Sequence, residues 1–111
     1  MAEEVLLVIS TFADAEEARR IARTVVEEQL AACANIFPQI ESIYRWKGNV
    51  ETAAEALVLM KTTIGRYQAL EERVKSLHSY EVPEIVCFRV SDGLPAYLDW
   101  VTQSCDGGAG G

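Results

Sequence analysis

His78 has the most adaptable chemistry of any residue in this chain. It is the only histidine among 111 residues, and it ends a stretch, residues 65–78, whose apolar side chains are spaced three and four apart as in a helix. A neutral imidazole binds copper or zinc readily, so we retain His78 as a weak metal-ligand candidate. A histidine at the C-terminal end of a helix also complements the helix dipole, and this structural interpretation stays open. The spacing supports no Ser–His–Asp or Cys–His set, and we therefore expect no enzyme.

A second group of candidates consists of polar side chains next to apolar runs. Lys61 follows the apolar residues 56–60, Glu84 precedes residues 85–88, and Tyr80 lies in the short polar segment between His78 and Glu84. Opposite charges at strand ends can hold a polar or anionic ligand or simply pair with each other. A lysine that extends its ammonium group into solvent from a strand end is the alternative for Lys61. We predict a partly buried cleft between subunits, lined by Tyr44, Lys61, Tyr80 and Glu84.

A long β-hairpin over residues 36–62 must position these side chains. Alternating apolar and polar residues mark its first arm from residue 40 to 46, and residues 47–49 include Gly48 and Asn49, which tolerate positive φ in a short turn. Each arm is roughly 36 to 43 Å long at ~3.3 Å per residue. The helices elsewhere reach only roughly 18 to 26 Å at 1.5 Å per residue.

The tip of this hairpin is therefore expected to extend beyond its covering helices. It carries Tyr44, Trp46 and Val50, and large apolar groups on an uncovered strand usually mark a partner surface. We predict self-association through these three residues. A curled hairpin whose tip stands in water is the alternative.

The order of elements predicts an α+β fold, a ferredoxin-like βαββαβ sandwich with an extra C-terminal helix and a long hairpin between the second and third strands. Asp14 and Glu17 predict a capping box at the start of the first helix, and Pro38 predicts a bulge in the hairpin. The apolar residues 56–60 should be buried on both faces. We expect a single domain over residues 1–105 and a disordered Gly-rich tail over residues 106–111.

Charge and cysteine content narrow the class of protein. A formal net charge of -7 argues against nucleic acid and against anionic membrane surfaces as partners. The first apolar run, residues 5–9, is too short for a signal peptide, and we expect a reduced, cytoplasmic protein. Cys33 and Cys87 are expected to be small buried residues and Cys105 to be exposed and free.

Five blocks of the chain resemble the signature segments of the CutA divalent-cation tolerance family. They are residues 30–36 (LAACANI), 42–48 (SIYRWKG), 61–63 (KTT), 77–85 (LHSYEVPEI) and 97–100 (YLDW). The resemblance covers about residues 5 to 104 and implies a ferredoxin-like protomer, a tight homotrimer and a link to copper and other divalent metal ions. The family also resembles the trimeric PII signalling proteins in architecture, which implies, as the alternative function, a small-molecule-sensing trimer that uses clefts between subunits.

The resemblance also bears on metal binding. A copper site proposed for some members of the family corresponds to Ser10, Leu77 and His78 of this chain, and of these only His78 is a good ligand. Copper(I) prefers soft sulfur ligands, for which a serine hydroxyl is a poor substitute. We therefore expect no tightly bound cofactor and at most a weakly held divalent cation, copper or zinc.

Overall fold

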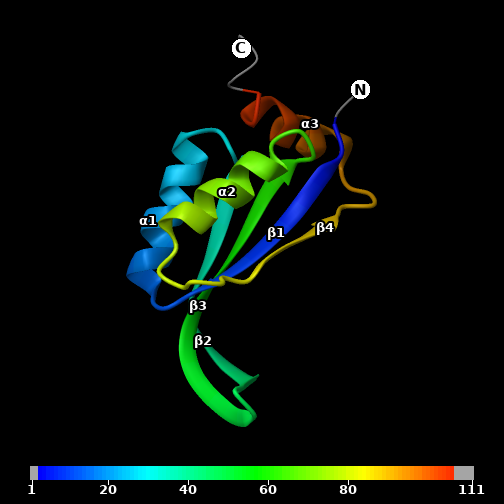
Figure 1. The fold of residues 1–111 in the computed structure, drawn as a ribbon. Helices are drawn as coiled ribbons and strands as arrows, with labels where there is room; N and C mark the ends of the chain where they lie inside the picture. Colours follow the sequence, from blue (N-terminus) through cyan, green and yellow to red (C-terminus); the bar gives the residue numbers. More distant parts are fainter. Residues whose placement is uncertain (1–2, 107–111) are drawn as a thin grey trace.

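The chain folds into one four-stranded antiparallel sheet with helices packed against it (Figure 1). The computed structural model describes residues 3–106, so that most of the predicted tail, residues 107–111, and residues 1–2 lie outside the described part. The elements in chain order are β1 (Val5–Phe12), α1 (Ala15–Glu27), β2 (Cys33–Trp46), β3 (Asn49–Thr63), α2 (Tyr67–Leu77), β4 (Ile85–Arg89) and α3 (Pro95–Ser104). The strand order is β2-β3-β1-β4. This arrangement confirms the predicted ferredoxin-like α+β fold with its long hairpin and additional C-terminal helix.

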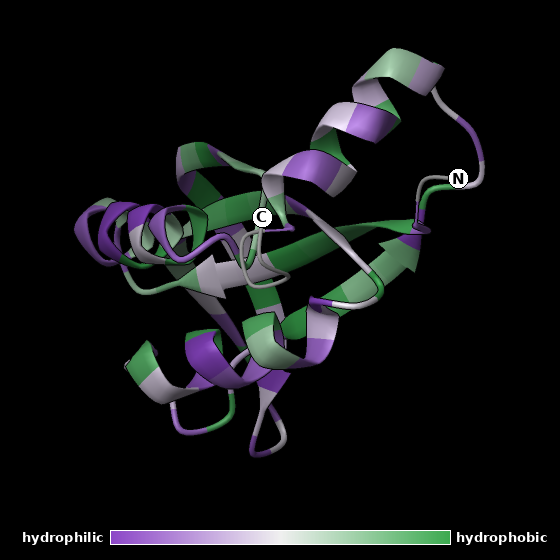
Figure 2. Cartoon of the chain, turned by 90° about the horizontal axis from the view of Figure 1, so that it is seen from above, coloured by the Kyte–Doolittle hydropathy of each residue, from purple (hydrophilic) through white to green (hydrophobic). Residues whose placement is uncertain are grey.

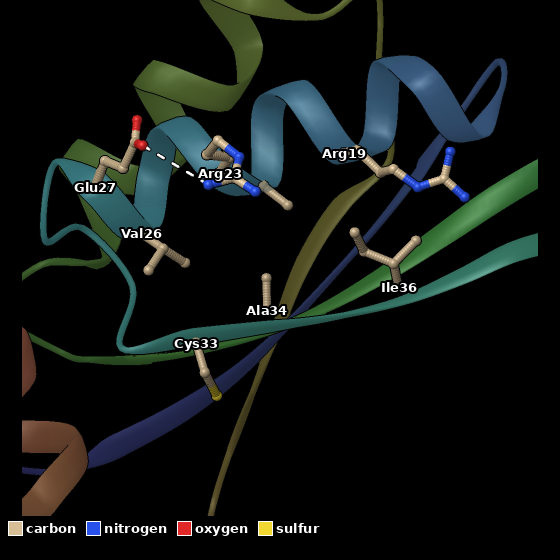
Figure 3. Close-up of a pocket in the computed structure, with 8 residues that line it drawn as sticks. Arg19, Arg23, Val26, Glu27, Cys33, Ala34 and Ile36 are labelled. Atoms are coloured by element: carbon tan, nitrogen blue, oxygen red, sulfur yellow. Dashed lines mark ion pairs between the residues drawn. The ribbon is translucent and has the colours of Figure 1, made fainter.

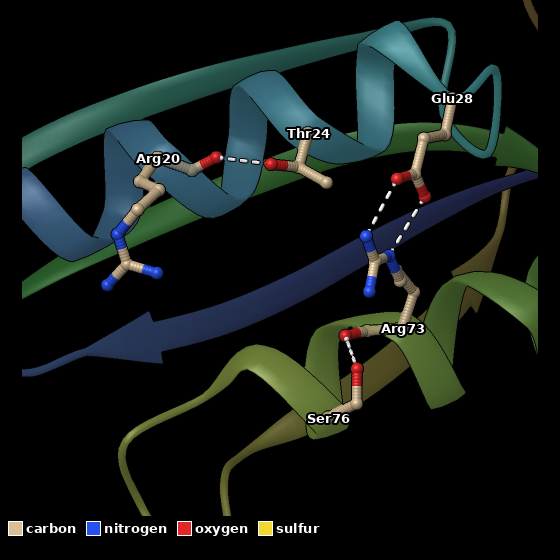
Figure 4. Close-up of polar contacts among 5 residues, drawn as sticks. All are labelled: Arg20, Thr24, Glu28, Arg73 and Ser76. Carbon is tan, nitrogen blue, oxygen red and sulfur yellow. Dashed lines mark hydrogen bonds and ion pairs between the residues drawn. The ribbon is translucent and has the colours of Figure 1, made fainter.

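One hydrophobic core fills the space between the sheet and helices α1 and α2. Alternate residues of the two central strands point into it, as expected for a sheet with one covered face. The side chains with at most 1% exposure include Val8 and Phe12 of β1, Val58 and Met60 of β3, Ile21 and Val25 of α1, and Leu70 and Val74 of α2. Arg73 of α2 adds a bidentate ion pair to Glu28 at the end of α1, with N–O distances of 2.9 and 2.8 Å (Figure 4).

The other face of the sheet is left largely uncovered. Residues 56–60 were expected to be buried on both faces, but only Ala56, Val58 and Met60 are buried, and the intervening Leu57 and Leu59 are partly exposed. The prediction is wrong because α1 and α2 cover the same face (Figure 1). Figure 2 shows that the strands are nevertheless largely hydrophobic, whereas the helices alternate between hydrophobic and hydrophilic residues. The uncovered face is therefore unusually apolar for a surface in water.

The hairpin turn has only two residues between the paired Trp46 and Asn49. Lys47 and Gly48 both have positive φ, 50° and 83°, as a type I′ turn requires. Asn49 was predicted to be part of the turn but begins β3. Figure 1 shows the far half of the hairpin extending well beyond α1 and α2. The molecule is accordingly elongated, 47 Å along its longest axis and 26 × 21 Å across.

An irregularity interrupts the pairing of β2 with β3 halfway along the hairpin. The register shifts between the pairs Phe37–Leu57 and Ile40–Glu55, at the position of Pro38. Proline cannot donate a ladder hydrogen bond and is tolerated on an edge strand such as β2. The predicted bulge is thus confirmed, and it lies where the hairpin leaves the body of the protein.

The cysteines differ from their predicted environments. Cys105 is only 2% exposed because α3 returns the chain onto Val5 and Ala32, which form a small second core with it. Cys87 is exposed because β4 lies at the edge of the sheet, and Cys33 is only partly buried. No helix among residues 3–106 is long and apolar enough to cross a membrane.

Candidate functional site

His78 connects the segment after α2 to the end of β1. The backbone N–H of Tyr80 donates to its Nδ1 at 3.1 Å, so the ring proton must lie on Nε2, which donates to the carbonyl oxygen of Thr11 at 2.7 Å. The ring also stacks on Phe12, with centroids 4.6 Å apart and an interplanar angle of 15°. Both ring nitrogens are therefore engaged by backbone groups, and a metal ion could bind only by displacing one of them.

Glu17 joins the same corner from the start of α1. The Asp14 carboxylate accepts a hydrogen bond from the Glu17 N–H at 2.8 Å, as predicted for the cap. The Glu17 side chain does not complete the predicted capping box; its two oxygens accept from the N–H groups of Ala13, at 3.2 Å, and Ser79, at 2.8 Å. Burial opposes ionisation of Glu17, but the hydrogen bonds from Ser79 and Ala13 outweigh it and hold the pKa of the carboxyl below its ordinary value.

Tyr80 extends this corner toward the hairpin. Its hydroxyl donates to Oε2 of Glu55 at 2.6 Å, and its ring lies against His78 at 4.8 Å between centroids. Burial raises the pKa of the Tyr80 phenol strongly, and the Glu55 carboxylate and nearby Tyr44 raise it further. We call Tyr44, Glu55, His78 and Tyr80 the Tyr80 cluster. In this cluster the Tyr80 phenol stays protonated and donates its hydrogen bond to the Glu55 carboxylate. Such an arrangement suits the binding of a polar group better than proton transfer.

Ser10 and Glu84 contribute structure to this region rather than free ligand atoms. The fully buried Ser10 hydroxyl donates to the backbone oxygen of Glu84 at 2.7 Å, while the Glu84 residue itself is exposed. Because its hydroxyl is buried and engaged in this hydrogen bond, Ser10 is not available to bind a ligand. Among the described residues, no group of three or more His, Cys, Asp or Glu side chains could hold a metal ion.

Lys61 lies near the C-terminal end of β3, whereas Glu55 of the Tyr80 cluster lies in the middle of that strand. Its Nζ donates to Oδ1 of Asn35, and it pairs across the sheet with Leu7 and Cys33. Six residues separate it from Glu55 on the same strand, which corresponds to roughly 20 Å. One chain therefore brings Tyr44 and Tyr80 together but places Lys61 far from both. The cleft shared between subunits stays a prediction.

The end of the sheet that carries Lys61 has an aromatic surface that the sequence reasoning did not connect with it. The Tyr97 hydroxyl lies 3.8 Å from Sγ of Cys33, and the Tyr97 and Trp100 rings are 5.6 Å apart. Tyr97 and Trp100 are 40% and 44% exposed. Their spacing of three residues on a helix was a signal that they share a face.

The predicted interface residues stand in solvent at the hairpin tip. Tyr44, Trp46 and Val50 are 44%, 60% and 66% exposed in the single chain. Ile43, which the prediction did not include, is 69% exposed. Lys47 places its Nζ 5.7 Å from the centroid of the Trp46 ring, and this contact leaves most of the ring surface uncovered.

Comparison of the sequence with known proteins identifies one family. The family model of the CutA1 divalent ion tolerance proteins matches residues 6–104. The divalent-cation tolerance protein CutA of Thermus thermophilus is 50% identical over 102 residues, which are 92% of this chain and 97% of that protein. Protein CutA of Mus musculus is 51% identical over 86 residues, 78% of this chain, but the match spans only 49% of the mouse protein's length.

Solved structures agree with the fold. A divalent cation tolerance protein (Cut A1) from Thermus thermophilus superposes with a TM-score of 0.88 at 48% identity, covering 90% of this chain and 97% of that one. CutA1 from Oryza sativa superposes with a TM-score of 0.90 at 40% identity, covering 93% and 94%. The chain therefore belongs to the CutA1 divalent ion tolerance protein family.

Proposed function

We propose that this protein is a non-enzymatic homotrimer that takes part in the cell's response to copper and other divalent metal ions. Family membership supports the link to divalent cations. The state of His78 supports a non-enzymatic role, because an imidazole with both nitrogens engaged by backbone is poorly placed to act as a general base. The net charge of -7 supports a protein without nucleic-acid or membrane partners, and we place it in the cytoplasm.

The exposure of the hairpin tip is the main observation that supports the proposed trimer. Trp46 and Val50 keep about two thirds of their surface in water, on the far half of the hairpin, which extends beyond α1 and α2. The uncovered sheet face adds Phe37, Val86 and Phe88, each 41% to 53% exposed. Edge strands β2 and β4 are both open in the single chain. A closed ring of three chains can pair such edges and cover both apolar surfaces.

Any direct metal binding is proposed to be weak and centred on His78. Coordination of copper(II) or zinc through Nε2 must break the hydrogen bond to Thr11, and His78 belongs to no group of three or more His, Cys, Asp or Glu side chains within the described residues. The affinity should therefore be far below that of a dedicated site with three or four ligands. Tolerance to divalent cations would then act through the whole trimer rather than through a tightly held cofactor.

Native mass spectrometry of protein taken directly from cells tests this proposal. We expect a mass of three chains with no retained stoichiometric metal, and reversible adducts after copper(II) is added. A dominant monomer at micromolar concentration contradicts the trimer. A metal ion retained through dialysis in a fixed ratio to the chain contradicts the proposed weak binding.

The second candidate function is a PII-like small-molecule sensor. The separation of Lys61 from the Tyr80 cluster along β3 favours it, because only a neighbouring chain could bring these groups to one cleft with Tyr44 and Glu84. A thermal-shift screen of small polar and anionic compounds discriminates the two functions. A saturable ligand whose binding is lost in both Lys61→Gln and Tyr80→Phe supports the sensor, and a screen in which only metal ions shift the melting temperature supports the cation response.

A further inference from the structure

Helix α1 and the first part of β2 do not close against each other. A groove of about 490 Å³ runs between them, along the open edge of the sheet (Figure 3). The small side chains of Ala22 on α1 and Ala34 on β2 leave this space where larger residues would fill it. Its volume lies within the range of roughly 300 to 1,000 Å³ that is usual for small-molecule sites.

The floor of the groove is apolar. Figure 3 shows Ala34 and Ile36 pointing from β2 toward α1, with Val26 pointing back from the helix, while Sγ of Cys33 points away from the groove. These strand residues pair on β3 with the buried Met60 and Val58, so the floor is continuous with the core. An apolar ligand segment would gain contact there by displacing water.

The rim of the groove carries two arginines one helical turn apart. Arg19 makes no ion pair within the described residues. Arg23 approaches Glu27 only at 4.0 Å, and both side chains of this pair are mostly exposed, 78% and 68%. In a chain with a net charge of -7, two weakly compensated guanidinium groups over an apolar floor favour a ligand that is anionic at one end and apolar at the other.

The dimensions indicate how long this ligand can be. Arg19 and Glu27, at the two ends of the helical wall, are about 12 Å apart at 1.5 Å per residue. The opposite wall, from Cys33 to Ile36, is about 10 Å long. A carboxylate at Arg19 and Arg23 could therefore extend an alkyl or aromatic body of medium length over Ala34 and Ile36. Small hydrophilic anions could use only the rim.

We propose that this groove binds a small amphiphilic carboxylate of the medium-chain fatty-acid class. Its carboxylate contacts Arg19 and Arg23, and its apolar body lies on Val26, Ala34 and Ile36. All the residues that line the site belong to one chain, and the site does not depend on metal binding. It is also distinct from the Tyr80 cluster, whose polar residues lie elsewhere in the fold.

Octanoate is the probe for this site, measured on the full chain by titration calorimetry and by amide chemical shifts. We expect saturable binding with shifts concentrated in residues 19–36. The double variant Arg19→Gln/Arg23→Gln should weaken binding roughly five- to thirtyfold, as for loss of two partly exposed charge contacts. Arg20→Gln is the matched control, because Arg20 is on the same helix but does not line the groove, and it should change affinity less than twofold.

Two further comparisons test the groove in ways that do not require the arginine variants to fold. Octylammonium and inorganic phosphate, tested against the unmodified protein, should each bind at least tenfold more weakly than octanoate. Ala34→Leu, with circular dichroism to check the fold, should reduce octanoate binding by filling the groove. Equal binding of octanoate and octylammonium, shifts spread over the hairpin tip instead of the groove, or no saturable binding below the micellar concentration would each overturn the proposal.

Discussion

The carboxylate of Glu17, in the first turn of α1, accepts a hydrogen bond of 2.8 Å from the backbone N–H of Ser79, 62 residues later in the chain. The same carboxylate also accepts a hydrogen bond from the N–H of Ala13. A single buried acid thus connects the end of β1, the start of α1 and the segment after α2. His78 is adjacent to Ser79, and the orientation of the Tyr80 cluster therefore depends on this acid.

Glu17→Gln should destabilise the protein at neutral pH. It should also make the free energy of unfolding less dependent on pH in the acid range. The pKa of Glu17 is lower in the folded protein than in the unfolded chain, so its contribution is fully present above the unfolded pKa and is lost as pH falls through the folded pKa. Loss of hydrogen bonds to a charged acceptor should cost roughly 1.5 to 3 kcal/mol at pH 7. Urea unfolding at a fixed protein concentration, repeated from pH 7 to low pH, measures it.

Glu16→Gln provides the control for this substitution. Glu16 occupies the same turn of α1, but it is exposed and has no comparable hydrogen bond. Its replacement should change the free energy of unfolding by less than about 1 kcal/mol through the helix dipole alone. The prediction is wrong if both substitutions have the same effect, or if Glu17→Gln leaves the acid transition unchanged.

Tyr80 should ionise at higher pH than an ordinary tyrosine. Burial raises its pKa first, and the carboxylate of Glu55, 2.6 Å from the hydroxyl, raises it further. The difference in ultraviolet absorbance titration between the unmodified protein and Tyr80→Phe isolates this residue from the other three tyrosines. Glu55→Gln should move the Tyr80 transition to lower pH. An unchanged transition in Glu55→Gln would show that the hydrogen bond does not control the phenol.

A double-mutant cycle on Tyr80→Phe and Glu55→Gln should yield a coupling free energy of roughly 0.5 to 1.5 kcal/mol, the usual net value of a hydrogen bond. Chemical unfolding of the unmodified protein, the two single variants and the double variant measures the four free energies of unfolding. Tyr67→Phe, another tyrosine with a raised pKa but at a different position, should show no coupling to Glu55→Gln. Additive effects of Tyr80→Phe and Glu55→Gln would rule out a functional pair.

Metal removal should leave the melting temperature unchanged, because nothing in the described part of the chain forms a set of three metal ligands. Copper(II) added in titration calorimetry should bind weakly, and His78→Gln should abolish this binding. His78→Gln also loses the stack on Phe12, so its fold must be checked by circular dichroism. A sub-micromolar, stoichiometric site that persists in His78→Ala contradicts the proposal.

Local patterns in the sequence predicted the elements and several of their local features. The alternation around Tyr44 and Trp46 predicted the hairpin, and Pro38 predicted its bulge, because both depend on a few neighbouring residues. The contact of Glu17 with Ser79 and that of Tyr80 with Glu55 could not be predicted in the same way. Each joins elements far apart in the chain, and their approach depends on where the helices end against the sheet.

The failed expectations have the same origin. The cleft between subunits is not among them and stays a prediction, although the sequence alone did not show how far along β3 Lys61 lies from Glu55, the residue that Tyr80 contacts. Cys105 was expected to be exposed because glycines follow it, but α3 folds back and buries it against Val5 and Ala32. Helix α1 ends at Glu27, and Gln29 adopts a positive φ of 61° just after it, which the local pattern did not indicate.

Trp46→Glu should convert the proposed trimer into monomer or aggregate. Trp46 and Tyr44 are still 60% and 44% exposed in one chain. Burying that remaining surface at ~25 cal/mol per Å² is worth roughly 4 to 6 kcal/mol per chain as an upper estimate, comparable with the stability of a small domain. A carboxylate at residue 46 removes this gain and adds a desolvation cost. Light scattering coupled to size exclusion measures the mass, and calorimetry measures the melting temperature.

Two controls separate the loss of this contact from a general effect of charge. Trp46→Phe keeps an aromatic group at the tip and should retain the trimer, with a lower melting temperature. Ala69→Glu places the same charge on the exposed face of α2, away from the hairpin, and should change neither mass nor melting temperature appreciably. Because unfolding of an obligate trimer includes dissociation, the melting temperature of the unmodified protein should rise with its concentration. A Trp46→Glu protein that keeps the trimer mass and melting temperature would end the argument that the hairpin tip holds the assembly together.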